Sequence, residues 1–363
     1  MGRLDYIDSV RGIAATAVVY LHLAVFLRHA GADSWDFMFF TEIVDAGKVG
    51  VVAFFIVSGM VIPHSLSSKA SNPVKRFAVR RFFRLYPAYW LSALLAACFL
   101  WIADGKDLPG PFFLYTAGGK DLPSTFVINL SMLQQFVGVP NLIGLYWTLQ
   151  IELIFYVLCA LVFALRWTRN RHWIAFGFLA YAVIAAVVRG NLTARIPGGS
   201  TALALALMFG GSVWRRYVVD RDAGALRWSL RFLGAFAVLM PVIAVLGYNP
   251  DLGFKETWYQ SLLSYFTGVG LVIGLTTWRV QGRALSWLGR ISYSTYLFHP
   301  IVIANYFMLV PVSAVAPHLH VAFVLALTLC AAHLIYVFVE APSIKYGRTL
   351  SASGENDAIR VEN

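Results

Sequence analysis

The chain has 363 residues, of which 59% are hydrophobic and only 13% are charged. Its mean hydropathy of +0.68 excludes an ordinary soluble domain of this length. The formal net charge of +11 follows the pattern of membrane topology described below and attracts anionic lipid headgroups, so it does not indicate a nucleic-acid partner. The composition therefore predicts a polytopic membrane protein.

Ten segments are apolar and about long enough to cross the hydrocarbon core of a bilayer as helices. In chain order they are 8–28, 50–66, 87–103, 147–166, 173–188, 200–214, 231–247, 258–277, 286–308 and 320–340. We therefore expect an all-α membrane helix bundle with about ten transmembrane helices.

The distribution of lysine and arginine predicts the orientation of these helices, because positively charged loops tend to stay cytoplasmic. With the N-terminus inside, the internal loops hold 17 lysine and arginine residues and the external loops hold 6. Both termini should then be cytoplasmic, in a multi-pass protein of the inner (cytoplasmic) membrane. The first segment resembles a signal peptide in its position only, since its length and the later spans argue that it stays in the membrane.

The sequence predicts one membrane-embedded domain over residues 1–345. The polar end of the chain, 346–363, is expected to be a disordered cytoplasmic tail. No metal site is expected, because "PHLH" supplies at most two ligands. The three cysteines lie in apolar segments without metal-ligand spacing and are interpreted as packing residues; they are Cys98, Cys159 and Cys330.

Ionisable residues in the first segment need an explanation, because such groups are costly inside a membrane. Arg11 and His22 are eleven residues apart, which on an α-helix is three turns plus about 20° and a rise of roughly 16 Å. They therefore share one face, with His22 well inside the membrane and Asp8 placed to pair with Arg11. A structural explanation, an ion pair at the helix end and a histidine bonded between helices, remains open.

Several blocks of the chain, in order, resemble the integral-membrane acyltransferase type 3 family. They are "DSVRGIAATAVVYLH", "GVVAFFIVSGMVI", "RRFFRLYPAYW", "YWTLQIELIFY", "LGRISYSTYLFHP" and "VFVEAPSIK". The sequence departs from the family pattern at Gln150 and Ile151, which precede Glu152, and lacks an acidic residue early in its second block.

The resemblance implies a membrane enzyme that moves an acyl group, usually acetyl from cytoplasmic acetyl-CoA, onto a hydroxyl of an envelope-bound or secreted acceptor. Exopolysaccharide, lipopolysaccharide O-antigen, a lipo-oligosaccharide and a macrolide are all compatible acceptors. The expected partners are acyl-CoA, the hydroxyl-bearing acceptor and membrane lipids. The sequence does not indicate an oligomeric state.

Histidine is the side chain best suited to deprotonate a hydroxyl near neutral pH, so we expect His22 to be the catalytic base. It could act on the acceptor directly or first carry the acyl group as an acyl-imidazole. Glu152 lies at a similar expected depth and could orient His22 and stabilise its imidazolium form. The alternative is that Glu152 is a structural partner of an arginine or tyrosine.

Arg80 and Arg84 lie one helical turn apart, and Arg81 lies beside them, on the expected cytoplasmic side. Together with Arg11 they could bind the phosphates of acetyl-CoA. Attraction to lipid headgroups is the alternative role for this cluster.

Tyr293, Tyr296 and His299 recur at helical spacing in the ninth segment, which suits a site for acceptor hydroxyls. Trp147, in the block "YWTLQIELIFY", is assigned to the same acceptor site. The structural alternative to an acceptor site is that these polar residues form hydrogen bonds between helices. The main functional alternative is a transporter or flippase of an acyl or glycan intermediate, whose polar residues would line a pathway.

Overall fold

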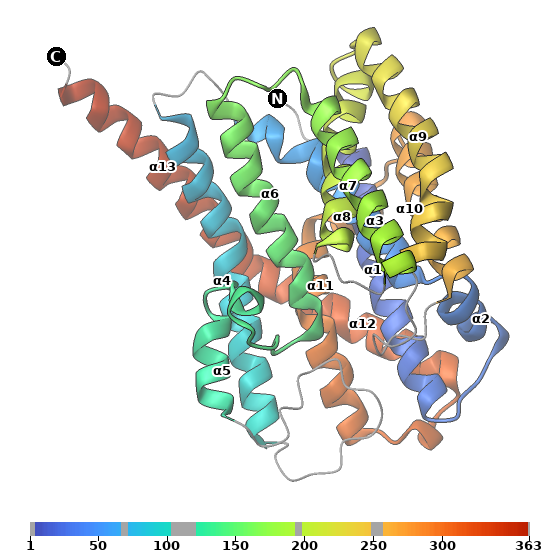
Figure 1. Ribbon diagram of the computed structural model, residues 1–363. Helices are drawn as coiled ribbons and strands as arrows, with labels where there is room; N and C mark the ends of the chain where they lie inside the picture. The colour runs from blue at the N-terminus through green and yellow to red at the C-terminus, as the bar shows by residue number, and fades with distance from the viewer. Residues whose placement is uncertain (1–3, 67–71, 103–120, 193–197, 248–256, 362–363) are drawn as a thin grey trace. The chain divides into compact units, whose positions relative to one another are not determined.

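The structure is a computed structural model that describes residues 4–66, 72–102, 121–192, 198–247 and 257–361. Within these residues every regular element is a helix (Figure 1). The expected all-α fold class is therefore confirmed.

Eleven long helices account for most of the chain. They are α1 (Asp5–His29), α3 (Ala46–Val61), α4 (Pro73–Ile102), α6 (Trp147–Ala164), α7 (Arg171–Leu192), α8 (Gly199–Val218), α9 (Ala223–Gly247), α10 (Trp258–Thr277), α11 (Arg283–Leu309), α12 (Pro317–Ile335) and α13 (Ala341–Val361). Shorter pieces are α2 (Trp35–Met38), α5 (Leu122–Asn129), π-helical turns at Phe39–Ile43 and Tyr336–Glu340, and 3₁₀ turns at Pro63–Ser65, Gln134–Val137, Gly144–Tyr146 and Val312–Ala314.

Each of the ten expected segments coincides with one long helix between α1 and α12. In the described part of the chain, seven helical stretches are long and apolar enough to cross a membrane. They include α1, α3, α4, α6, α7, α9 and the run of α12 into α13. The protein is thus a multi-pass membrane protein. Ten crossings remain a prediction, because α8, α10 and α11 are not among these seven stretches. The cytoplasmic location of both termini also remains a prediction.

The segment expected to be a disordered tail is instead helical as far as Val361, because α13 continues past residue 345. Its first turns have partners on α4, which explains the difference. The ring of Tyr346 packs edge-on against Phe83 with 5.1 Å between centroids, and Arg80 Nε donates a hydrogen bond to Ser351 Oγ at 2.9 Å. The boundary of the membrane domain at residue 345 remains a prediction.

The chain forms two compact units, each made of segments that are far apart in the sequence. Unit 1 contains residues 1–21, 34–64 and 151–289, and unit 2 contains residues 22–33, 65–150 and 290–363. Three of the five boundaries between the units therefore fall inside α1, α6 and α11, and the other two follow residues 33 and 64.

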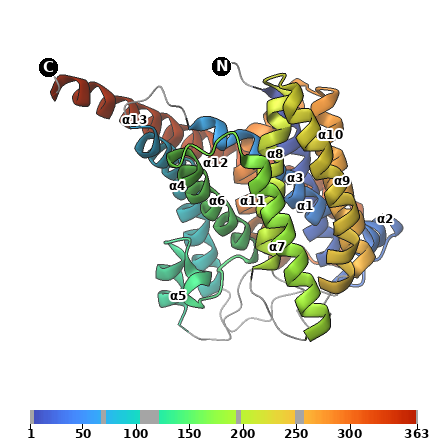
Figure 2. The ribbon, with the colours of Figure 1, turned by 45° about the horizontal axis from the view of Figure 1, so that its top comes forward.

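In unit 1, α8 contacts α3, α7 and α9, and most of its residues are buried (Figures 1 and 2). Glycines let α3 and α8 touch through their backbones. A Cβ atom added at Gly59 would lie 1.7 Å from the Met208 carbonyl oxygen, and one at Gly211 would lie 2.2 Å from the Ile56 carbonyl oxygen. Small residues at helix contacts are typical of membrane bundles.

A second close approach in unit 1 joins α1 to the first turns of α11. A Cβ atom on Gly289 would lie 2.1 Å from the Asp8 carbonyl oxygen, and one on Gly12 would lie 2.6 Å from Leu288 Cβ. The glycine of the block "DSVRG" therefore has a packing role, because only a residue without a side chain fits at this contact.

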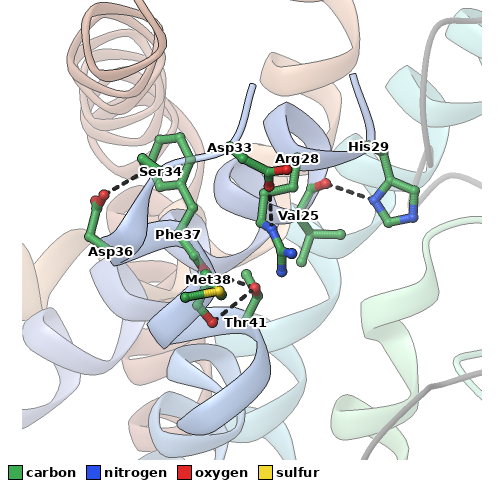
Figure 3. Close-up of polar contacts among 9 residues, drawn as sticks. All are labelled: Val25, Arg28, His29, Asp33, Ser34, Asp36, Phe37, Met38 and Thr41. Carbon is green, nitrogen blue, oxygen red and sulfur yellow. Dashed lines mark hydrogen bonds and ion pairs between the residues drawn. The ribbon is translucent and has the colours of Figure 1, made fainter. Parts of the chain in front are cut away.

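In unit 2, α4 contacts α5, α13 and the π-helical turn Tyr336–Glu340. The last turn of α1 also belongs to this unit. There Arg28 Nε lies 2.8 Å from Asp33 Oδ1, and His29 Nδ1 donates to the Val25 carbonyl at 2.8 Å (Figure 3). These contacts fix the end of α1 a little beyond His22.

We expect Gly211→Ala to lower the melting temperature and membrane abundance of the protein. The added methyl group would meet backbone atoms of Ile56, which cannot rotate away, and overpacking of this kind costs roughly 1–3 kcal/mol or more. Gly177→Ala on α7 is the control, because nothing lies within 4 Å of the position that its methyl group would take. The control should stabilise its helix by up to about 1 kcal/mol. Equal melting curves for the two variants would contradict the backbone contact.

Candidate active site

Two of the predicted site residues, His22 on α1 and His299 on α11, form a buried pair in unit 2. The Nδ1 atom of His22 lies 2.8 Å from the Nε2 atom of His299. The ring planes are nearly parallel, with 5.0 Å between centroids and 12° between planes, so the two rings meet edge to edge through this hydrogen bond. His22 is 9% exposed and His299 is fully buried. The pairing joins residues that are 277 positions apart in the sequence.

The hydrogen bonds of the pair assign its protons. His299 Nδ1 lies 3.2 Å from the Thr295 carbonyl oxygen, which can only accept, so this nitrogen carries a hydrogen. In the neutral ring, Nε2 of His299 is then an acceptor, and Nδ1 of His22 must be the donor. Nε2 of His22 is consequently the unprotonated nitrogen, which is the form that a general base requires.

Tyr296 lies next to this pair, with 6.1 Å between its ring centroid and that of His299. Its hydroxyl is 2.8 Å from Thr148 Oγ1, which itself donates to the Leu145 carbonyl at 3.0 Å. Trp147 precedes Thr148 at the start of α6 and is 39% exposed. Sequence reasoning missed Thr148, although its position beside Trp147 in the block "YWTLQIELIFY" was a usable signal.

Tyr293 makes a different contact from the one expected of an acceptor site. Its hydroxyl donates to the Leu85 carbonyl of α4 at 2.9 Å, and the guanidinium of Arg84 lies over its ring at 5.8 Å. This side chain therefore joins α11 to α4. Binding of an acceptor by Tyr293 remains a prediction.

The arginines of α4 contact other parts of unit 2. Arg84 Nη1 lies 2.6 Å from Oε1 of Glu340, a buried carboxylate whose Oε2 accepts a hydrogen bond from Ser294 at 2.8 Å. Arg81 Nη2 donates to Ser65 Oγ at 2.7 Å, and Arg80 binds Ser351 as described above. Sequence reasoning did not assign a role to Glu340, although a lone acid in the apolar run "VFVEAP" was a signal for one. Binding of CoA by these arginines remains a prediction.

Glu152 and Arg11 belong to unit 1, whereas His22 belongs to unit 2. The carboxylate Oε1 of Glu152 accepts a hydrogen bond from the hydroxyl of Tyr156, one turn further along α6, at 2.5 Å. Glu152 therefore has a tyrosine as a hydrogen-bond partner, which is the arrangement that the structural alternative predicts. Arg11 and His22 lie on the same continuous helix, α1, as their spacing requires. The functional roles of Glu152 and Arg11 remain predictions.

The part of the chain that the structure describes contains no group of three or more histidine, cysteine, aspartate or glutamate side chains that could hold a metal ion. The three cysteines are free thiols.

The fold and the histidine pair define a multi-pass membrane protein with a buried site suited to proton transfer. A family model described as an acyltransferase domain matches residues 4–337. The chain therefore belongs to the membrane acyltransferase type 3 family, which confirms the resemblance of its sequence blocks. No solved structure matches it.

Several curated proteins are similar over most of the chain. The peptidoglycan O-acetyltransferase OatA of Listeria monocytogenes is 26% identical over 94% of this chain and 56% of its own length. BcsY of Komagataeibacter xylinus is 29% identical over 96% of this chain and 85% of its length. The acyltransferase MdmB of Streptomyces mycarofaciens is 27% identical over 53% of this chain and 48% of its length. The chain thus spans about half the length of OatA, and its match to MdmB covers about half of each protein.

Removing the carboxylate of Glu340 should destabilise the protein strongly, because it leaves Arg84 without its ion-pair partner. Loss of one partner of a buried pair costs about 3–5 kcal/mol. Glu340→Ala should therefore lower the melting temperature and the membrane abundance. The double variant Arg84→Met with Glu340→Leu is the control, and it should recover much of the loss because neither charge remains. A single variant that melts like the wild type would show that the pair has no structural role.

Proposed function

We propose that this protein is an O-acetyltransferase of the bacterial inner (cytoplasmic) membrane. It transfers an acetyl group from cytoplasmic acetyl-CoA to a hydroxyl of a cell-surface or secreted carbohydrate. The observation that carries the proposal is the His22–His299 hydrogen bond, which supports a role for Nε2 of His22 as the base. Membership of an acyltransferase family supports the reaction class.

In the proposed reaction, Nε2 of His22 accepts the proton of the acceptor hydroxyl while that oxygen attacks the thioester carbonyl. The carbon–sulfur bond breaks, and CoA leaves as a thiolate that takes the proton back from His22. His299 holds the His22 ring through Nδ1 and stabilises the imidazolium that forms, a task that a carboxylate performs in hydrolase triads. Acylation of His22 Nε2 before transfer is the second route compatible with this geometry.

A carbohydrate acceptor is favoured by the relatives, since one of them is named a peptidoglycan O-acetyltransferase. Trp147, Tyr293 and Tyr296 are proposed to contact it, and the ring of Tyr296 lies 6.1 Å from that of His299. A transporter or flippase is disfavoured, because the family model that matches almost the whole chain describes an acyltransferase.

The donor is proposed to bind through Arg80, Arg81 and Arg84, and donor binding by Arg11 stays a prediction from the sequence. The three arginines of α4 fall within about one helical turn, so their guanidinium groups can meet neighbouring phosphates of one CoA molecule.

His22→Gln should fold and bind CoA like the wild type yet transfer no acetyl group, because glutamine cannot accept the proton. His22→Ala should lower turnover by roughly 10²-fold or more, which is the usual contribution of a positioned base. The rate is measured with acetyl-CoA and a carbohydrate acceptor, alongside membrane abundance and a melting curve. Substantial transfer by His22→Gln at normal abundance would exclude His22 as the base.

His299 is a positioning residue in this scheme, so a conservative replacement should rescue it. His299→Gln places an amide oxygen near the position of Nε2, where it can accept from Nδ1 of His22, whereas His299→Leu has no acceptor. We expect the glutamine variant to retain more activity than the leucine variant, with both showing similar abundance. Equal losses would indicate that His299 does not act through this hydrogen bond.

Replacing Arg80 and Arg81 together by glutamine should weaken CoA binding by at least about tenfold, since charge-assisted hydrogen bonds to phosphate are lost. Arg76→Gln on the same helix is the matched control and should bind CoA normally. Wild-type binding should also weaken as salt rises. Calorimetry showing the same CoA affinity in the double variant and the wild type would assign these arginines to lipid binding or topology instead.

A further inference from the structure

Arg215, near the end of α8 in unit 1, is a buried arginine without a counter-ion among the described residues. It is 7% exposed. Its Nε atom is buried and makes no hydrogen bond, and no described residue forms an ion pair with its guanidinium. Arg216, its neighbour, is different, because it pairs with Asp222.

Two other basic residues lie close to Arg215. His64, after the last turn of α3, is within electrostatic range of both Arg215 and Arg171, the first residue of α7. We call these three residues the Arg215 cluster. The acidic residue nearby is Asp220, whose charge also acts on all three groups. Asp220 is exposed and forms no ion pair with Arg215 or Arg171.

Neighbouring contacts hold the helix ends of this region together. Arg279, after the end of α10, donates from Nη2 to the Val218 carbonyl at 3.4 Å and lies over the ring of Tyr6 at 5.9 Å. Arg216 Nη1 donates to the Arg169 carbonyl, just before α7, at 3.4 Å. The start of α1 and α7 and the end of α8 and α10 therefore meet around the cluster, on the side that the charge pattern predicts to be cytoplasmic.

The Nε donor of Arg215 is buried without a hydrogen bond, which is unfavourable because its desolvation is not offset. An anion at this position would remove that cost. Arg215 and Arg171, from α8 and α7, suit a phosphate group, which offers several acceptor oxygens and up to two negative charges. His64, in the 3₁₀ turn after α3, can donate a further hydrogen bond from its neutral ring.

We propose that the Arg215 cluster is a phosphate-binding site, separate from the arginines of α4. The phosphate could belong to the nucleotide part of acyl-CoA, in which case the inference rests on the proposed function. It could instead belong to an anionic lipid headgroup, which is independent of that function. The shared chemistry is a phosphate ester that the buried guanidinium binds.

The test uses the full chain in nanodiscs and compares Arg215→Gln with Arg216→Gln. Each variant loses one positive charge, and the two positions are adjacent. Arg216 is the control because it already pairs with Asp222. The Ala225 backbone N–H and Arg216 both lower the pKa of Asp222. In one arm, adenosine 3′,5′-bisphosphate is titrated by calorimetry into protein in phosphatidylcholine discs. In the other arm, discs contain phosphatidylglycerol, and retained lipid is counted by native mass spectrometry.

We expect Arg215→Gln to weaken binding in one arm by at least about tenfold, while Arg216→Gln stays within about twofold of the wild type. A loss in the first arm assigns the phosphate to the nucleotide, and a loss in the second assigns it to a lipid. Unchanged binding in both arms, or equal losses in the two variants, would overturn the proposal. If Arg215→Gln does not accumulate, Arg171→Gln is judged by the same criteria.

The binding measurements need no turnover, so they are separate from the test of the proposed function. Acetyl transfer by the wild type decides whether the protein is an acetyltransferase. A wild type that binds the bisphosphate or the lipid through Arg215 but transfers no acetyl group would keep the phosphate site and reject the proposed function.

Discussion

Polar groups inside a bilayer have no water to bind, so each must find a partner within the protein. This constraint explains the most informative contacts of the structure. The Nδ1 atom of His22 finds its partner in His299, Tyr296 finds Thr148, and the carboxylate of Glu340 finds Arg84 and Ser294. In the histidine pair, satisfying one nitrogen fixes the tautomer, and this leaves the second nitrogen of His22 in the basic form. The need to satisfy buried polar groups in a membrane thus leaves His22 with a nitrogen that can accept a proton.

Close helix packing limits how this arrangement can change. In unit 1 the backbones of α3 and α8 meet at Gly59 and Gly211, and α1 meets the first turns of α11 at Gly12 and Gly289. Contacts at glycine leave no space for larger side chains, so the helix positions are defined by backbone atoms that have little freedom to move. The glycine that follows Arg11 in the sequence block therefore fixes the helix that also carries His22.

Much of the fold was predictable from the sequence, because hydrophobic length alone locates membrane helices. All ten expected segments correspond to helices, and the spacing of Arg11 and His22 placed both on α1. The pairing of His22 with His299 was not predictable by spacing, because 277 residues separate them and only the tertiary fold brings them together. The same holds for Arg84 and Glu340. The helical continuation of α13 was missed because residues 346–352 look polar, although Phe83 and Arg80 provide them with partners.

The surroundings of two arginines could not be predicted from the sequence. Arg84 and Arg215 both lie in segments that the charge pattern assigns to the cytoplasmic side, and topology alone would explain each of them. The fold gives them different surroundings, since Arg84 has a buried carboxylate and Arg215 has no counter-ion among the described residues. An arginine with an internal partner can be explained by stability. A buried arginine without one is better explained by a ligand, and this difference becomes visible only when the helices are packed.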